Sequence, residues 1–497
     1  MKYYRKSHIT TAMRASIGAS ALINSGVYGF VTNLAEEMGV SRPFVYAQKE
    51  TILSVFKIKP GTDKAAMRLK NKKEIKKLIL ALRFCCKSSI NGISETLKIL
   101  GYDINSNGFI SEYLNELADK LIDDLPIVNE PISILADEIF VCGQPILVIL
   151  DAISHTILAI ELSSDRKGET WMNCYNTLIN KGYDVNVIVK DLGSGLQKGI
   201  DLINENEKIN IISVADLFHL LVRFNPFIAS LEKKAEGAIE SEENKLKLFE
   251  NRKSQGAITK AELSLLEAIV KCDSAMLKFD IYEYLRKELH SAFNPFNENG
   301  SFRDYDIIHG DVIAILDLLQ ENFENHEKIN SAVKFLRKNI SGYIPYLTQI
   351  EEVMKKYNSI IPEYLNREIC LSYQKALKSI AIKDYSLSKK IHKESNEHFK
   401  LAIDCAKKGH EKNNLEDLLE DLQKTVRSSS ALEAKNSVLR SYINTMSGQI
   451  TQKHLNLIAF YMNHKVSIRG KYKGKSPLER LTGVEEKENF INLLLAI

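Results

Sequence analysis

The spacing of apolar residues changes twice along the chain. Up to about residue 128, apolar residues recur every three to four positions, which is the period of a helix with one buried face. From Pro131 to Ala215 they gather in short runs that are typical of strands. From Leu220 to about Lys424 the helical period returns. The pattern predicts an α/β core with helical regions on both sides of it in the sequence.

The strand-like stretch contains five apolar runs. The first three are separated only by Gly143-Gln144 and Ser154-His155, so we expect an antiparallel meander. Three antiparallel strands followed by helix, strand, helix and strand resemble a ribonuclease H-like core with a mixed five-stranded sheet. The expected strands are Ile132–Cys142, Pro145–Ile153, Thr156–Ser163, Val185–Lys190 and Ile209–Ala215, and the expected helices are Glu169–Asn180 and Leu196–Asn204.

The N-terminal region has the pattern of two short helices joined by a tight turn. Val31, Leu34 and Met38 lie on one face of the first helix, and Gly39 suits a left-handed turn. Ser41 is a good N-cap for the second helix. This order is typical of a helix-turn-helix, whose second helix enters the DNA major groove; an ordinary helical hairpin is the alternative. The residues expected to reach phosphates or base edges are Ser41, Arg42, Tyr46 and Gln48.

The long helical stretch interrupts the core before its last helices. A structureless connection of roughly 200 residues is implausible in a compact domain, so we predict a large all-α insertion. Residues 61–128 form a second region with a helical pattern. This region could be a further DNA-binding unit, or it could serve only in packing and dimerisation. The expected domains are a helix-turn-helix domain at 1–60, a second helical region at 61–128, the first part of the core at 129–219, the insertion at 220–425, and the core completion with a basic tail at 426–497.

Charge is distributed unevenly along the chain. Residues 1–85 contain 16 Lys and Arg against five Asp and Glu, and residues 427–497 contain 11 against five. Because the whole chain carries +4, the middle carries −13. Basic ends favour a polyanionic partner, although a solvated Lys-rich surface is equally compatible with the counts.

Other compositional features narrow the class of protein. The seven Cys are irregularly spaced, which excludes a disulfide framework and paired zinc knuckles and favours a reducing compartment. No apolar stretch approaches the roughly 20 residues of a membrane span, and the N-terminus lacks the apolar core of a signal peptide. We therefore expect a soluble intracellular protein.

Three carboxylates stand at positions suited to metal chemistry. Asp137 lies within the first apolar strand, and Asp191 ends the fourth, which neighbours the first in the sheet order above. Glu433 lies near the start of a late helix, where Asn436 and Arg440 share its face. Phosphoryl transfer on nucleic acid commonly uses two Mg²⁺ ions about 4 Å apart, held by carboxylates on a rigid frame. The sequence therefore predicts a site for two Mg²⁺ or Mn²⁺ ions.

Simpler explanations exist for these acids. Asp191 can end a strand before a glycine turn, and Glu433 follows Ser430 at the spacing of a helix capping box. Glu138, on the opposite strand face, and Asp151, late in the second strand, are competing candidates.

The residues around these acids resemble the bacterial insertion-sequence transposases of the DDE type. The resemblance is carried by ADEIFVCGQPILVILDAISHTILAIELSSD, VIVKDLGSGL, ADLFH, ALEAKNSVLRSYI and the tail that ends in GKSPLERLTG. In that family a helix-turn-helix region precedes a ribonuclease H-like core, and an insertion often separates the second Asp from the Glu. The family's metal-binding acids fall on Asp137, Asp191 and Glu433. The second spacing, 433 − 191 = 242 residues, is much longer than in compact members.

The resemblance implies a function and partners. The expected activity is Mg²⁺-dependent DNA cleavage at element ends followed by transfer of the 3′ hydroxyl into target DNA. The partners would be double-stranded DNA and a second subunit, in the bacterial cytoplasm at the nucleoid. A non-catalytic DNA-binding regulator, or an inactive transposase relic, is the alternative. The residues expected to contact DNA phosphates are Lys435, Asn436, Arg440, Arg469, Lys471, Lys473 and Lys475.

The ADLFH segment has two interpretations. Asp216 and His219 resemble a D-x-x-H element that follows the core in several of these families and would be an accessory DNA contact. The simpler interpretation, which we favour, is an Asp at a helix start beside a half-buried His.

Overall fold

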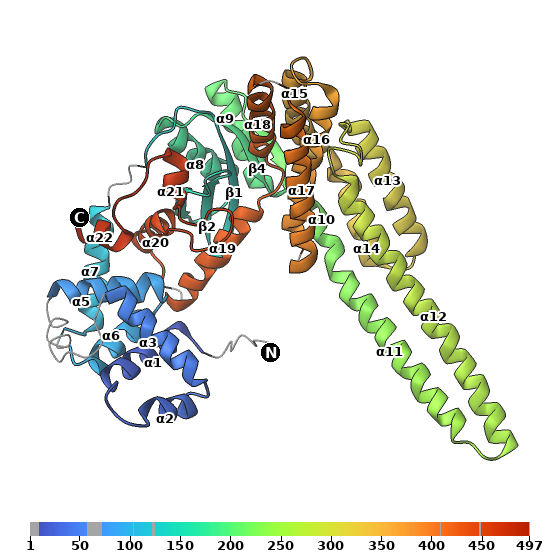
Figure 1. Cartoon of the computed structure of the whole chain (residues 1–497), viewed down its shortest axis with the longest axis horizontal. Coiled ribbons are helices and arrows are strands. Elements are labelled where there is room, and N and C mark those ends of the chain that lie inside the picture. The colour runs from blue at the N-terminus through green and yellow to red at the C-terminus, as the bar shows by residue number, and fades with distance from the viewer. Residues whose placement is uncertain are drawn as a thin grey trace. The chain divides into compact units, whose positions relative to one another are not determined.

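The computed structural model divides the chain into two compact units (Figure 1). The first unit comprises the described residues up to Asn186, together with Ser194–Ile209 and those from Ser430 onward. The second comprises Val187–Gly193 and Asn210–Ser429. The structure describes residues 9–56, 72–102, 104–121, 125–382, 384–407, 409–446 and 449–496.

Three helices form the N-terminal part of the first unit, namely α1 (Thr11–Ile23), α2 (Phe30–Glu37) and α3 (Arg42–Phe56). Gly39 has a φ of 59° in the turn between α2 and α3, and Ser41 Oγ accepts from the Phe44 N–H at 3.3 Å. α1 packs against α3 so closely that a Cβ at Gly18 would lie only 2.6 Å from the Gln48 carbonyl oxygen. The core of this part is formed by Ile9, Ile17, Ala21, Leu34, Ala35, Val40 and Val45.

A second helical group follows in the same unit. The predicted domain boundary at residue 60 lies outside the described residues. The group's helix over Ile90–Ile99 ends close to Gly101, whose φ is 75°. The group consists of α5 (Lys72–Leu80), a π-helical turn (Ala81–Cys85), α6 (Ile90–Ile99) and α7 (Asn107–Lys120).

The predicted mixed five-stranded sheet is confirmed, with the order β3-β2-β1-β4-β5. β1 pairs antiparallel with β2 and β2 with β3, whereas β4 and β5 are parallel. The first and fourth strands are therefore neighbours, as predicted. The strands are β1 (Ile132–Val141), β2 (Gln144–Asp151), β3 (Ile157–Leu162), β4 (Val185–Lys190) and β5 (Ile212–Ala215).

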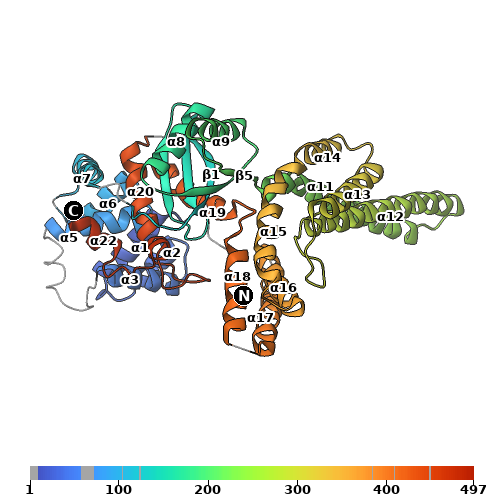
Figure 2. The ribbon, with the colours of Figure 1, turned by 90° about the horizontal axis from the view of Figure 1, so that it is seen from above.

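Helices α8 (Gly168–Asn180) and α9 (Ser194–Glu207) connect the later strands and pack against each other (Figure 2). Trp171 on α8 is fully buried. A Cβ at Gly199 would lie 2.7 Å from the Trp171 Cβ, so only glycine permits this helix spacing.

The end of the chain returns to the first unit as α19 (Ser430–Ile443) and α20 (Gln452–His464). α20 covers the free edge of β3. Gln452 accepts from the Leu162 N–H at 2.8 Å and donates to the Ile160 carbonyl at 2.7 Å. Asn463 accepts from the Ile157 N–H and donates to the Ile157 carbonyl, at 2.8 and 2.9 Å. These amides occupy the backbone groups that an edge strand otherwise exposes.

Two short helices follow α20, namely α21 (Pro477–Thr482) and α22 (Phe490–Ala496). None of the helices within the described part of the chain is long and apolar enough to cross a membrane.

The second unit is almost entirely helical apart from its strand segments. Helices α11 and α12 lie side by side as a long hairpin (Figures 1 and 2), and the Tyr282 hydroxyl donates to the Phe224 carbonyl at 2.6 Å at its base. The helices are α10 (Leu217–Leu221), α11 (Asn225–Glu250), α12 (Gln255–Ala292), α13 (Tyr305–Asn322), α14 (Glu327–Asn339), α15 (Ile344–Asn358), α16 (Glu363–Ala381), α17 (Tyr385–Cys405) and α18 (Gly409–Lys424).

The helical region leaves and re-enters the fold at one place in the second unit. The Leu217 N–H donates to the Arg427 carbonyl at 3.0 Å. The Ser429 hydroxyl donates to Asp216 Oδ2 at 2.5 Å. The segment between these contacts therefore has its two ends side by side, which is the geometry of an inserted module.

Candidate active site

Asp137 on β1 and Asn436 on α19 are in direct contact. The Asn436 Nδ2 donates to Asp137 Oδ2 at 2.8 Å, although the two residues are 299 positions apart. Both are buried, and the Glu138 N–H donates to the other carboxylate oxygen of Asp137 at 2.8 Å. α19 therefore packs against β1 with its polar face toward the carboxylate.

The other end of the Asn436 amide has an unmet hydrogen-bonding capacity. Its Oδ1 is buried and has no hydrogen-bond partner among the described residues. A buried amide oxygen left without a partner costs about 1–3 kcal/mol, so a polar group at this position would be favoured. The atom is a hard oxygen ligand next to a carboxylate, which is the donor chemistry that Mg²⁺ and Mn²⁺ prefer.

Glu433 and Arg440 extend this face along α19. Glu433 lies three residues before Asn436 in the first helical turn and is half-buried, and Arg440 lies four residues after it and is exposed. The face thus presents an acid, an amide and a cation in succession, as the sequence spacing predicts.

Asp191 directly follows β4, at the strand end where it was expected. Its Oδ1 accepts from the Gly193 N–H at 2.7 Å, which forms a tight turn, and the residue is half-buried. Within the described residues, no three Asp, Glu, His or Cys side chains are gathered closely enough to hold a metal ion. The structure therefore brings Asp137 and Asn436 together, but it does not gather the three predicted acids into a ready-made metal site.

The two competing carboxylates have other partners. Glu138 Oε1 accepts from Arg166 Nη1 at 2.6 Å. Asp151 Oδ2 accepts from the Ser154 N–H at 2.6 Å, and burial raises the pKa of Asp151. Both acids therefore have roles in the local structure.

The predicted basic tail is exposed. Arg469, Lys471, Lys473 and Lys475 lie on a loop that is closed by hydrogen bonds from the Ser467 N–H to the Lys475 carbonyl at 3.0 Å and from the Gly474 N–H to the Ser467 carbonyl at 2.8 Å. The loop presents its cations to solvent.

Lys435, in contrast, is half-buried on α19. Burial, followed by the charges of Arg480 and Lys465, lowers the pKa of Lys435 to about 8. Burial, followed by Arg480, Lys435 and Lys471, lowers the pKa of His155 to about 4. Arg480, Lys465 and His155 thus belong to a group of basic side chains that the sequence does not reveal, and His155 is uncharged near pH 7.

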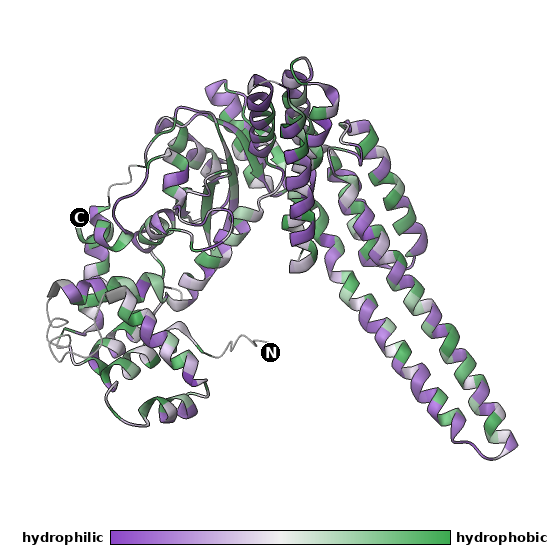
Figure 3. Ribbon diagram, viewed as in Figure 1, coloured by the Kyte–Doolittle hydropathy of each residue, from purple (hydrophilic) through white to green (hydrophobic). Residues whose placement is uncertain are grey.

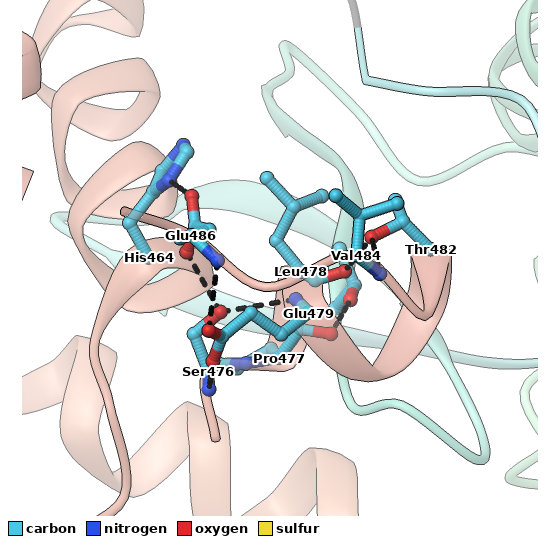
Figure 4. A network of polar contacts seen from close by, with 9 residues as sticks. His464, Ser476, Pro477, Leu478, Glu479, Thr482, Val484 and Glu486 are labelled. Atoms are coloured by element: carbon cyan, nitrogen blue, oxygen red, sulfur yellow. Dashed lines mark hydrogen bonds and ion pairs between the residues drawn. The ribbon is translucent and has the colours of Figure 1, made fainter. Parts of the chain in front are cut away.

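A polar network holds α21, the helix that carries Arg480 (Figure 4). Ser476 and Glu479 form a capping box, with the Ser476 N–H donating to Glu479 Oε2 at 2.5 Å and the Glu479 N–H to Ser476 Oγ at 3.0 Å. The Glu486 carboxylate accepts from Ser476 Oγ at 2.8 Å and contacts His464 Nδ1. The S-P-x-E part of the tail motif is therefore a helix start, and recognising it would have placed Arg480 on this short helix.

At the start of α3, three of the four residues that were expected to contact DNA are exposed. Ser41, Arg42 and Tyr46 are exposed on the first turns of α3. Gln48 is half-buried, because α1 packs against its backbone at Gly18.

Asp216 and His219 adopt the simpler of the two arrangements considered. Asp216 caps α10, accepting from the Phe218 N–H at 2.9 Å, and its Oδ2 lies 2.6 Å from His219 Nδ1. Burial opposes ionisation of Asp216, but the hydrogen bonds with His219 and Ser429 hold the pKa of Asp216 below its ordinary value. Ser429 is a partner that the sequence analysis missed.

Comparison with known proteins gives little further information. No family model matches the sequence, and no curated protein matches it. Among solved structures, the chain is similar to the Drosophila P element transposase strand transfer complex, at 14% identity and a TM-score of 0.30, over 78% of this chain and 100% of that one. A TM-score this low supports no inference about fold or function. Membership of the bacterial DDE transposases therefore stays a prediction.

Proposed function

We propose that this protein is a DNA transposase that cleaves DNA at element ends and transfers the freed strand into target DNA. The observation that carries the proposal is the 2.8 Å hydrogen bond between Asn436 and Asp137. It brings the predicted carboxylate strand and the predicted Glu433 helix together across 299 residues of sequence. That is the juxtaposition a carboxylate site at the sheet margin requires.

The proposed metal ligands are Asp137, Asp191 and Glu433, with the Asn436 amide oxygen as a further donor. Support comes from the oxygen-only donor set, from the adjacency of β1 and β4, and from the unpartnered Asn436 Oδ1. Two divalent ions, when bound, would supply Lewis-acid stabilisation of charge at the scissile phosphate. Asn436 would orient Asp137, and Arg440 would neutralise a phosphate next to it.

The proposed DNA contacts lie on two parts of the first unit. The exposed loop cations Arg469, Lys471, Lys473 and Lys475 would track the sugar–phosphate backbone. The exposed start of α3, with Ser41, Arg42 and Tyr46, would enter the major groove, with Gln48 further along the helix.

Metal-dependent nicking of a plasmid that carries the segments flanking the coding sequence tests the proposal. We expect cleavage by the wild-type chain with Mg²⁺ or Mn²⁺ and none with a chelator. Asp137→Asn, Asp191→Asn and Glu433→Gln should each reduce cleavage about a hundredfold or more. Asp201→Asn, an exposed aspartate on α9, is the matched control and should cut like the wild type. Retained cleavage in all three variants would reject the assignment.

A non-catalytic DNA-binding protein is the second candidate. The observation in its favour is the absence, among the described residues, of three acidic or other metal-binding side chains in one cluster. Salt-dependent DNA binding without cleavage under any divalent metal would select this candidate.

We further propose that the chain acts as a homo-oligomer through the α11–α12 hairpin. Apolar residues recur along α12 (Figure 3), and four of them share one stripe at seven-residue spacing. They are Leu263, Val270, Leu277 and Tyr284, exposed by 60, 68, 60 and 61%. On α11, the exposed residues Lys233, Glu240 and Lys247 are charged, and exposed apolar residues such as Ile239 and Leu246 are less exposed than the α12 stripe, at 39 and 44%. A seven-residue apolar stripe suits a helix of a second copy.

A further inference from the structure

Basic side chains from four separate segments lie in the first unit, and the one from the β2–β3 turn, His155, is uncharged near pH 7 because its pKa is lowered to about 4. Lys435 directly precedes Asn436 on α19, and Arg480 lies on α21. His155 belongs to the turn between β2 and β3, and Lys471 to the exposed loop. Three of these groups meet at one aromatic ring, because Arg480, His155 and Lys471 all lie against Tyr472, with Lys471 Nζ 5.5 Å from the ring centre.

Arg480 is oriented within this cluster by an aromatic ring. Its guanidinium carbon lies 3.8 Å above the centre of the Tyr472 ring, and its Nε donates to the Ser476 carbonyl at 3.4 Å. The His155 ring meets the same Tyr472 edge-on, with ring centres 5.3 Å apart. Arg480 Nη1 is buried and has no hydrogen-bond partner among the described residues. The Arg480 Nη1 donor is therefore held in place without an acceptor among the described residues.

The neighbouring acids Asp151, Glu479 and Glu486 accept hydrogen bonds from backbone and hydroxyl donors. Asp151 interacts electrostatically with Arg480, but its carboxylate accepts from the Ser154 N–H. Glu479 and Glu486 are occupied by the network in Figure 4. Glu433 lies two positions before Lys435 and is the nearest acid in sequence on α19. Partly buried like charges repel one another, and a bound anion offsets that repulsion.

The frame around the cluster is fixed. The capping box and Glu486 hold the start of α21, and Thr156 Oγ1 donates to the Pro477 carbonyl at 3.0 Å, which joins the β2–β3 turn to α21. His155 has a φ of 61°, an uncommon left-handed conformation that the surrounding turn must maintain. A fixed frame with a free guanidinium donor is suited to binding one small anionic group.

We infer that Arg480, Lys435, Lys471 and the His155–Tyr472 pair form a binding pocket for one phosphate group of the DNA backbone. The inference rests on the proposed function only for the identity of the ligand as DNA. The pocket would hold the strand next to the Asp137 carboxylate, with Arg480 as the phosphate-binding donor and Tyr472 as its support.

Inorganic phosphate tests the pocket without DNA. We expect saturating phosphate to raise the melting temperature of the wild-type chain by about 2–4 °C over potassium chloride of equal ionic strength. Arg480→Gln should abolish that difference, and Arg252→Gln, an exposed arginine in the second unit, should retain it. An equal rise in the wild type and Arg480→Gln would overturn the pocket.

Binding to a short duplex in the presence of a chelator tests the assignment to DNA. We expect Arg480→Gln to weaken binding about tenfold and to reduce the slope of log affinity against log salt by about one. Lys471→Gln, on an exposed loop where folding is not at risk, should reduce the slope similarly. Arg480→Lys should recover part of the affinity. Phosphate stabilisation with unchanged DNA binding would overturn the assignment to DNA.

These outcomes are separable from failure of the proposed function. All binding measurements are made without divalent metal and can be repeated in the Asp137→Asn background. A chain that never cuts DNA but loses affinity in Arg480→Gln rejects the transposase and keeps the pocket. A chain that cuts DNA and binds it equally well with Arg480→Gln keeps the transposase and rejects the pocket.

Discussion

At the scale of single residues, Asp137 is a buried carboxylate that a hydrogen bond from Asn436 stabilises. The carboxylate is buried within the sheet and receives one side-chain hydrogen bond and one from the adjacent backbone. Because buried carboxylates are stable only when they are hydrogen-bonded, each partner protects the other. The pair is therefore expected to contribute to folding whether or not DNA is bound.

A double-mutant cycle measures this coupling. Asn436→Ala should lower the free energy of unfolding by about 2–3 kcal/mol, because it leaves a buried carboxylate oxygen with one partner fewer. Asp137→Ala combined with Asn436→Ala should then cost less than the sum of the single changes, with a coupling of about 1–2 kcal/mol in urea denaturation. Strict additivity would show that the hydrogen bond contributes nothing.

The sequence did not indicate that Arg480 and His155 would lie near each other. Arg480 and His155 are 325 positions apart, and neither belongs to a periodic apolar pattern. Sequence spacing reveals partners within one helix, such as Glu433, Asn436 and Arg440, but it says nothing about which loops meet. That the strand of Asp137 and the helix of Asn436 would meet could be expected only from the order of the segments that resemble the DDE transposases.

At the scale of elements, apolar runs predicted the strands well and their ends less well. β4 has its predicted bounds, because Val185–Lys190 lies between two neighbouring strands and its residues other than Asn186 are buried. β5 was expected from Ile209 but begins at Ile212. Among the described strands it pairs with β4 alone, and the parallel ladder between them starts at Val187 and Ile212, so the partner limits the strand.

Helix α12 has more apolar residues than its contact with α11 buries. One face of α12 packs against α11, and the residues at Leu263, Val270, Leu277 and Tyr284 remain outside that contact. The seven-residue spacing is visible in the sequence, yet its significance emerges only when the inner face is known.

Light scattering tests whether this stripe joins two copies. Val270→Glu with Leu277→Glu should convert the wild-type dimer to a monomer, because four buried carboxylates would face one another across the contact. Lys247→Glu, at an exposed position of α11, is the control and should stay dimeric. A monomeric wild type at micromolar concentration would contradict the proposal.

At the scale of the whole molecule, the helical insertion depends on a small closure. The hydrogen bonds of Leu217 with Arg427 and of Asp216 with Ser429 join the two ends of the inserted region. Glu, Lys and Leu periodicity predicted the helical content of this region, but no pattern predicted the closure, because it involves single backbone and side-chain groups about 210 positions apart.

The closure gives stability a pH dependence with a definite sign. Because the pKa of Asp216 is lowered in the folded chain, its contribution is present above the ordinary carboxylate range and is lost as the pH falls through the folded pKa. Asp216→Asn should be less stable than the wild type by about 2 kcal/mol at pH 7. The difference should shrink in urea denaturation below about pH 4; a constant difference would exclude ionised Asp216 as its source.

The covering of β3 by α20 has a consequence for biosynthesis. Ile157 and its partner Asn463 are 306 positions apart, so the ribosome completes the meander long before it makes the helix that occupies its edge. At roughly 5–20 residues per second, the edge stays bare on the nascent chain for about 15–60 s. Chaperones that bind nascent chains would therefore matter most during this interval, and termination before α20 would release a fragment with an unpaired, aggregation-prone strand edge.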